Sequence, residues 1–357
     1  MLSNEASLRL KILRFPLIVG VVFIHNYDLS STLHGSSIGF AHAGALLDFV
    51  RNIVSQGIAR VSVPLLFLIS GYLFFLDFQP TIQSLAGKLK SRSRTLLIPF
   101  IFWNVATLTV IALAQSVPAA SKFLSGKTTP VSHLNGEALL DLIFGIHGVP
   151  ISYQFWFIRD LMVLVLLSPL VYVLCRRLGA PLLLALLGLW LANIWWVAVP
   201  ASDATLFFMI GAWLAIKGMT PFCVDRIGSL ATIVYIPLLL FDAVRFGSAG
   251  DLVVHKVSIL LGVVSVLWMT RYAIRSDDLK NHLVRLSGTS FFVFAAHEPL
   301  LTICRKISFK WVPLHSSYVA VGFYFLIPAF VIALLASLHP RMSVRFPRFT
   351  ALACGGR

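Results

Sequence analysis

Apolar segments, each near the length that crosses a lipid bilayer, recur along this chain of 357 residues. A transmembrane helix needs about 20 consecutive, mostly apolar residues. Segments of this length fold in lipid as helices, because hydrocarbon offers no partners for backbone N–H and C=O groups. The sequence therefore predicts an all-α, polytopic integral membrane protein with about ten transmembrane helices, at residues 12–29, 57–77, 95–115, 155–174, 180–198, 204–218, 227–245, 252–271, 286–304 and 316–338.

The composition agrees with a membrane protein. Hydrophobic residues make up 58% of the chain and charged residues only 12%, whereas soluble domains average about 25% charged residues. The formal net charge of +15 does not point to nucleic acid, because the basic residues fall in short clusters between apolar segments. Placing the N-terminus in the cytoplasm puts most of these clusters on the cytoplasmic side, so the positive-inside rule predicts an N-in/C-in topology.

The four cysteines are Cys175, Cys223, Cys304 and Cys354. They are widely scattered, with no CxxC pair and no zinc-like spacing, so we interpret them as packing residues. The sequence predicts no metal site and no permanently bound cofactor. Residues 30–56 and 116–154 form long outer segments, the second with a short helix near 136–146, and residues 339–357 form a short basic cytoplasmic tail.

The first apolar segment contains the two ionisable residues Arg14 and His25, in the run RFPLIVGVVFIH. Ionisable side chains within a membrane are costly, so each is a candidate functional residue. Eleven residues amount to roughly three helical turns, so both side chains lie on one face, about 16 Å apart along the axis. Asp28 follows His25 at i+3, close enough to orient an imidazole that acts as a general base.

A second intramembrane pair, His297 and Glu298, occurs in FFVFAAHEPLL. Counted from Leu286, His297 lies about 16 Å into its span, which matches the depth of His25. Two histidines at one depth can line one cavity, in which Asp28 or Glu298 is placed to steady the charge on a reacting histidine. The alternative places Glu298 in water, at a helix end broken by Pro299.

Two further groups of residues are candidates for substrate contacts. Arg92 and Arg94 lie in SRSR at the cytoplasmic entrance to the third span, and guanidinium groups bind phosphate through paired donors. Trp156, Arg159 and Asp160 lie at the outer end of another span, where an aromatic ring beside an Arg–Asp pair suits a sugar. The alternatives are ordinary positive-inside charges for the arginines and an interfacial aromatic anchor for the tryptophan.

Ser70 and Gly71 interrupt the bulky run PLLFLISGYLFF. Small residues in a membrane helix permit close approach of a second helix. We therefore expect a tight helix–helix contact at this point.

Taken together, these stretches resemble the membrane acyltransferase-3 family, whose members O-acylate polysaccharides and other extracytoplasmic acceptors. The resemblance rests on five stretches that keep the family's order over nearly the whole chain: RFPLIVGVVFIH, RVSVPLLFLISGYLFF, SRSRTLLIPFIFW, QFWFIRDLMVLVLLSPL and SFFVFAAHEPLL. The length resembles that of stand-alone members, without the SGNH esterase-like domain of longer ones. Residues 1–338 are then the transmembrane acyltransferase domain.

The resemblance implies an enzyme of the bacterial inner membrane that takes an acyl group from cytoplasmic acyl-CoA, most simply acetyl-CoA. The acceptor is a hydroxyl of an extracytoplasmic polysaccharide or lipid-linked glycan. His25 matches the family's essential histidine and Arg14 its partner arginine, while Arg92 and Arg94 match the basic pair associated with the donor. The sequence does not separate acetyl from succinyl donors, nor an acyl-histidine intermediate from direct transfer. The main alternative is a transporter or glycan flippase, although no repeat typical of transporters is evident.

Overall fold

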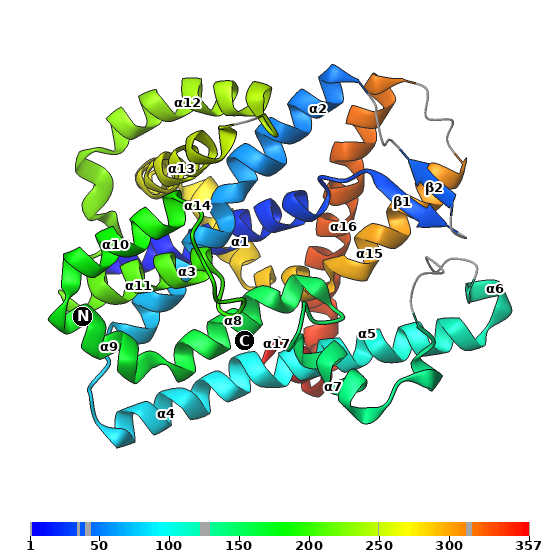
Figure 1. Ribbon diagram of the computed structural model, residues 1–357, viewed down its shortest axis with the longest axis horizontal. Helices are drawn as coiled ribbons and strands as arrows, with labels where there is room; N and C mark the ends of the chain where they lie inside the picture. Colours follow the sequence, from blue (N-terminus) through cyan, green and yellow to red (C-terminus); the bar gives the residue numbers. More distant parts are fainter. Residues whose placement is uncertain are drawn as a thin grey trace. The chain divides into compact units, whose positions relative to one another are not determined.

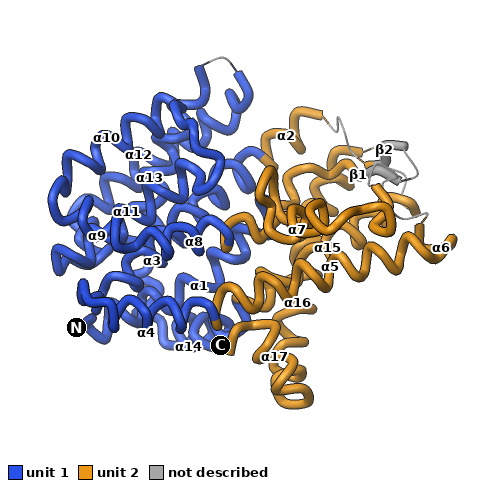
Figure 2. The backbone as a smooth tube through the Cα atoms, turned by 60° about the horizontal axis from the view of Figure 1, so that its bottom comes forward, with its two compact units in different colours: residues 1–24, 52–93, 159–290 blue, residues 25–51, 94–158, 291–357 orange. Residues whose placement is uncertain are grey.

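The computed structural model describes residues 2–33, 36–39, 44–121, 129–248, 250–311 and 316–356. The chain divides into two compact units, which are considered separately (Figure 2). Unit 1 comprises residues 1–24, 52–93 and 159–290, and unit 2 comprises residues 25–51, 94–158 and 291–357. Residues 34–35, 40–43 and 122–128, which belong to the segments 30–56 and 116–154, lie outside the described residues.

Unit 1 contains the following helices, of which α1 and α8 each extend a few residues into unit 2 (Figure 1): α1 (Asn4–His25), the π-helical η1 (Asn52–Ile58), η2 (Ala59–Val61), α3 (Ser62–Phe75), α4 (Ile82–Arg92), α8 (Trp156–Leu166), α9 (Ser168–Arg177), α10 (Gly179–Leu191), α11 (Ser202–Ile216), η6 (Pro221–Arg226), α12 (Gly228–Arg245), α13 (Asp251–Ala273) and α14 (Asp277–Ser287).

Unit 2 is also mainly helical. Its elements are β1 (Ser30–Leu33), β2 (Ser36–Gly39), α2 (Ala45–Arg51), the π-helical η3 (Ser93–Leu97), α5 (Ile98–Ser116), α6 (Pro118–Ser121), η4 (Val131–His133), α7 (Gly136–Phe144), η5 (Tyr153–Phe155), α15 (Ser290–Trp311), α16 (Ser317–Arg345) and α17 (Pro347–Cys354). The two short strands pair antiparallel. The short helix predicted near residues 136–146 is confirmed by α7.

The prediction of an all-α polytopic membrane protein is confirmed, although β1 and β2 add a small hairpin that the sequence analysis did not predict. Each of the ten predicted segments overlaps a helix, but their number as complete spans is not confirmed. Among the described residues, five helical segments are long and apolar enough to cross a membrane, and the pair formed by α8 and α9, bent by 67°, makes a sixth. The five are Ala45–Phe75, Ile82–Ser116, Gly228–Arg245, Asp251–Ala273 and Ser317–Arg345.

Helices α10 and α11 show why the count differs. They have 13 and 15 residues, which at 1.5 Å per residue extend for roughly 20 to 22 Å. The hydrocarbon core is about 30 Å thick. Local hydropathy finds such helices but does not fix where each one ends.

Helix α1 begins earlier and ends earlier than the predicted span 12–29. Ser3 starts it, because its hydroxyl accepts a hydrogen bond from the backbone N–H of Ala6 at 3.2 Å. The helix ends at His25, after which the buried Asn26 side chain donates to the backbone oxygen of Tyr324 at 2.9 Å. Arg14 and His25 therefore do lie on one continuous helix.

The tail at residues 339–357 is helical where it is described. Helix α16 continues to Arg345, and α17 packs against α5, where Trp103 Nε1 donates to the Ala353 backbone oxygen at 2.9 Å. Ala353 and Cys354 are buried within unit 2.

Two glycines bring α3 and α11 into close contact in unit 1. A Cβ atom on Gly71 would lie 2.2 Å from the backbone oxygen of Phe208, and one on Gly211 would lie 2.0 Å from that of Leu68. Both contacts are with backbone atoms, which have no rotamer to adjust. The tight helix contact expected at Gly71 is confirmed.

We expect Gly211→Ala to destabilise unit 1 by about 1–3 kcal/mol, the usual cost of overpacking a well-packed site. The measurement is thermal unfolding of the purified protein in detergent. Gly188→Ala on α10 is the matched control, because no heavy atom lies within 4 Å of the added Cβ. Equal melting temperatures for the two variants would contradict the close contact between α3 and α11.

Candidate active site

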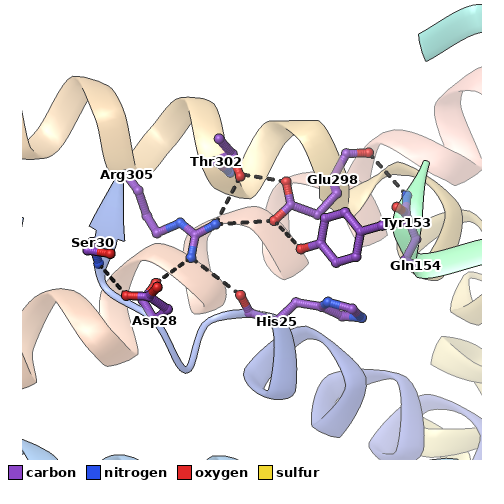
Figure 3. A network of polar contacts seen from close by, with 8 residues as sticks. All are labelled: His25, Asp28, Ser30, Tyr153, Gln154, Glu298, Thr302 and Arg305. Carbon is purple, nitrogen blue, oxygen red and sulfur yellow. Dashed lines mark hydrogen bonds and ion pairs between the residues drawn. The ribbon is translucent and has the colours of Figure 1, made fainter. Parts of the chain in front are cut away.

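His25, the last residue of α1, lies beside two other rings in unit 2, and Figure 3 shows one of them, that of Tyr153. The centroid of its imidazole lies 4.8 Å from that of the Tyr153 ring, in an edge-to-face arrangement. The His297 ring lies 5.2 Å away on the same measure. The structure thus brings together the two histidines that were placed at one depth by counting residues.

The hydrogen bonds of His297 fix its tautomer. Its Nδ1 lies 2.7 Å from the backbone oxygen of Phe294 and 3.3 Å from that of Val293. A carbonyl oxygen only accepts, so Nδ1 carries the hydrogen. In the neutral ring Nε2 then keeps its lone pair. His297 is 0% exposed, and Nε2 has no hydrogen-bond partner among the described residues.

Glu298 is buried, with 5% of its surface exposed, so the alternative that it faces water is wrong. Its Oε1 accepts a hydrogen bond from the Tyr153 hydroxyl at 3.0 Å and pairs with Arg305 Nη2 at 3.4 Å (Figure 3). Its Oε2 accepts from the backbone N–H of Thr302 at 3.4 Å. Three residues of unit 2 therefore hold the carboxylate through hydrogen bonds or an ion pair.

Arg305, on the same helix as Glu298, is also buried. Its Nη1 donates to the backbone oxygens of Asp28 at 2.6 Å and His25 at 3.3 Å. Its Nη2 donates to the Thr302 hydroxyl at 2.9 Å. One guanidinium thus links Glu298 to the chain segment that carries His25.

Helix α15 bends at Glu298, which has the non-helical backbone angles φ −105° and ψ 136°. Pro299 has no N–H, so the Ala295 backbone oxygen loses its partner in the helix. The side-chain amide of Gln154 replaces that partner, because Nε2 donates to Ala295 O at 3.1 Å and to Glu298 O at 3.3 Å. Gln154 therefore stabilises the bend that presents His297 and Glu298.

Helix α5 anchors the segment that carries Tyr153 and Gln154. The side-chain oxygen of Asn104 accepts from the backbone N–H of Ser152 at 3.0 Å. The Ser152 hydroxyl donates to that of Thr107 at 2.7 Å. Asn104 and Ser152 are both buried. Their contacts anchor Ser152 and thereby fix the position of the next residue, Tyr153.

Asp28 is exposed, and its carboxylate accepts a hydrogen bond from the Ser30 backbone N–H at 2.8 Å. This is the contact of a turn after a helix, in which the side chain satisfies the backbone two residues on. Its catalytic role stays a prediction.

The three predicted donor-binding arginines lie at exposed or half-buried positions. Arg14 is exposed on α1 and Arg94 is exposed in η3. Arg92, at the end of α4, is half-buried and lies 6.0 Å above the Phe74 ring. Lys88, one turn earlier, donates to the Phe74 backbone oxygen at 2.6 Å. Binding of a donor to these arginines stays a prediction.

The predicted acceptor-binding residues divide by exposure. Asp160 is 0% exposed, and its Oδ2 accepts from the Ala201 backbone N–H at 2.7 Å, at the start of α11. Its Oδ1 accepts from Arg159 Nε at 3.1 Å. Asp160 therefore anchors the α11 terminus, whereas Trp156 and Arg159 remain half-buried.

Sequence analysis did not single out Tyr153, Gln154 and Arg305. Arg305 lies seven residues after Glu298, about two helical turns along one face. That spacing predicts that the two side chains lie on the same side of the helix. Tyr153 and Gln154 directly precede the segment FWFIRDL, in which the sequence analysis considered only Trp156, Arg159 and Asp160. Their contacts with α15 join positions about 140 residues apart in the chain.

The sequence was compared with known proteins and solved structures. The profile of the acyltransferase-3 family, described as an acyltransferase domain, matches residues 8–337. The chain is 28% identical over 376 aligned positions to the succinoglycan biosynthesis protein ExoH of Rhizobium meliloti (strain 1021), with 100% of this chain and 94% of that protein covered. No solved structure matches the chain. The family match covers most of the chain, including every residue of the site around His25, and the chain belongs to the acyltransferase-3 family of multi-pass membrane acyltransferases.

Proposed function

We propose that this acyltransferase moves an acyl group from acyl-CoA to a hydroxyl of a polysaccharide or lipid-linked glycan, with acetyl-CoA as the first donor to test. The observation that carries the proposal is that the His25 ring lies beside both the Tyr153 and the His297 rings. A similar protein named for succinoglycan biosynthesis supports a polysaccharide acceptor.

The reaction converts a thioester and an alcohol into an ester and a thiol. In direct transfer, His25 takes the proton of the acceptor hydroxyl, and the oxygen attacks the thioester carbonyl. The C–S bond breaks, and the thiolate of CoA receives the proton from the imidazolium. In the two-step route, an imidazole nitrogen of His25 attacks the carbonyl, the C–S bond breaks and CoA leaves as the thiolate. The acceptor oxygen then attacks the acyl-imidazole, the C–N bond breaks, and the proton of the hydroxyl passes to the thiolate. Both routes require a neutral His25.

Arg14, Arg92 and Arg94 are the proposed contacts for the phosphates of the donor. Arg14 and Arg94 are exposed and Arg92 is half-buried. Arginine suits phosphate because its planar guanidinium offers two parallel donors. With the N-terminus and C-terminus in the cytoplasm of a bacterial cell, all three cations lie on the side where acyl-CoA is made.

Trp156 and Arg159 are the proposed contacts for the acceptor glycan. An indole face stacks on a sugar ring, and the guanidinium donates to hydroxyl oxygens. The buried Asp160 supports this site indirectly, because it orients Arg159 through the contact at 3.1 Å.

The decisive experiment supplies labelled acetyl-CoA to membrane vesicles that contain the protein and a surface glycan from its host. We expect label to appear on the glycan as a base-labile O-ester, and to be missing with vesicles lacking the protein. Movement of unmodified glycan across the vesicle membrane, without ester formation, would instead indicate a transporter.

In the same assay we expect Arg92→Ala/Arg94→Ala to raise the KM for acetyl-CoA at least about 10-fold. Each lost hydrogen bond to a charged group costs about 1.5–3 kcal/mol. The KM for the glycan should not change. Arg341→Ala/Arg348→Ala is the matched control, since both arginines are exposed. An unchanged KM for the donor in the first variant would rule out this phosphate site.

A further inference from the structure

Two chains of contacts connect the Glu298 carboxylate to His25, one through Arg305 and one through Tyr153 (Figure 3). The first chain reaches the main chain of His25, and the second reaches its ring. We infer that Arg305 and Tyr153 are positioning residues for His25, and that Glu298 is their common anchor. This inference rests on the proposed function of His25 as the reacting histidine.

The contact through Arg305 fixes the main chain where α1 ends. The last carbonyl oxygens of a helix have no N–H partner within that helix. Arg305 Nη1 supplies one to the oxygens of His25 and Asp28, so a single group holds both ends of the turn. Arg305 therefore adds a side-chain donor at the end of α1, next to the contact between Asn26 and the Tyr324 backbone oxygen.

The contact through Tyr153 fixes the ring. The Tyr153 hydroxyl donates to Glu298 Oε1, and its ring meets the His25 imidazole edge to face at 4.8 Å. Aromatic rings prefer the edge-to-face arrangement, so this packing restricts rotation of the imidazole. The hydrogen bond of the hydroxyl therefore fixes the position of the Tyr153 ring. That ring in turn limits the side-chain rotamers of His25.

The charges of Glu298 and Arg305 indicate that these residues position His25 rather than exchange protons with it. Glu298 and Arg305 are buried and form an ion pair of no net charge. Both Glu298 oxygens already accept hydrogen bonds, from Tyr153 and Arg305 on one side and from Thr302 on the other. The carboxylate thus acts on His25 through its neighbours.

The first test separates kcat from KM. We expect Arg305→Met to lower kcat about 100-fold, the loss that follows when a catalytic group is misplaced by about 1 Å. The KM for acetyl-CoA should remain within 2-fold, roughly the scatter of such measurements. Arg305→Lys, which retains a donor for the two carbonyl oxygens, should recover part of the loss. Arg348→Met, at an exposed position on α17, is the matched control.

A double variant tests whether the Tyr153 hydroxyl acts only through Glu298. Tyr153→Phe should lower kcat about 10-fold, because one hydrogen bond to a charged group is lost. Glu298→Ala should cost more, and Glu298→Ala/Tyr153→Phe should cost no more than Glu298→Ala alone. A further loss in the double variant would mean that the hydroxyl touches substrate, and would overturn its positioning role. Tyr318→Phe, 80% exposed on α16, is the control.

A second measurement needs no acyl transfer. Diethyl pyrocarbonate labels accessible neutral imidazoles, and peptide mass spectrometry gives the labelling rate of each histidine. We expect Arg305→Met and Tyr153→Phe to change the rate at His25 several-fold, relative to the exposed His282 on α14. The fully buried His297 should stay unlabelled if unit 2 remains folded.

The two measurements distinguish the possible failures. An unchanged rate at His25 in both variants, with His297 still protected, would overturn the positioning role even if the protein is an acyltransferase with His25 at its centre. A changed rate together with an inactive wild-type protein would leave the positioning of His25 supported and would count against the proposed substrates alone.

Discussion

His25→Ala is expected to reduce acyl transfer from labelled acetyl-CoA by about 100- to 10,000-fold, the range over which a general acid–base group contributes. Both proposed routes begin with a neutral imidazole at this position. We do not expect His297 to replace it, because the His297 ring is fully buried. Tyr153 and Glu298 keep their contact with each other when the imidazole is removed.

The variant should remain folded, because His25 is only half-buried. The KM for acetyl-CoA or its equilibrium binding should change little, since the proposed phosphate contacts lie elsewhere. His133→Ala, at an exposed position in η4, is the matched control and should retain full activity. Activity of His25→Ala above about one tenth of wild type would rule out His25 as the reacting group.

The largest expected loss of stability comes from Arg9→Met in unit 1. Arg9 is 3% exposed and makes a two-pronged contact with Asp225, at 2.7 and 2.8 Å. Its Nε donates to the Thr270 hydroxyl at 2.7 Å, and Nη2 also donates to the Leu267 oxygen at 2.8 Å. The guanidinium carbon lies 3.8 Å above the Phe222 ring centroid.

Removing one partner of a fully buried ion pair costs about 3–5 kcal/mol. The Asp225 side chain is 26% exposed, so water screens the carboxylate that remains, and we expect a loss near the lower end of that range. We therefore expect a marked drop in the unfolding temperature of Arg9→Met in detergent. Asp225→Asn should also destabilise, and Arg9→Met/Asp225→Asn should lose less than the sum of the two single variants. Arg226→Met, at an exposed position in η6, is the control. Equal stabilities of Arg9→Met and Arg226→Met would show that the Arg9–Asp225 pair contributes nothing.

Arg9 also illustrates the limit of charge patterning. In the sequence it belongs to the basic N-terminal cluster with Lys11 and Arg14, and such clusters indicate topology. Its partner Asp225 lies 216 positions away in the chain. No local pattern distinguishes a cation that pairs across a folded unit from one that marks the cytoplasmic side.

Glu298 shows the same limit within the candidate site. The sequence identified His297 and Glu298 as an intramembrane pair, and the alternative placed the carboxylate in water. The burial of Glu298 in the structure excludes the alternative in which its carboxylate faces water. Pro299 indicated a break in the helix, but only the fold supplies Gln154, whose amide satisfies the carbonyl oxygen that the proline leaves without a donor.

The sequence by itself determined the class of the protein, the place of its helices along the chain, and the family. Hydrophobicity acts through local composition, and a helix satisfies its own backbone, so both can be read in order along the chain. It also singled out His25 and His297, because an ionisable residue in an apolar segment is costly wherever it lies. Only the tertiary structure decided which groups surround His25. Tyr153 and Arg305 reach it from segments more than 100 residues away, and contacts of that kind depend on side-chain packing that periodicity does not encode.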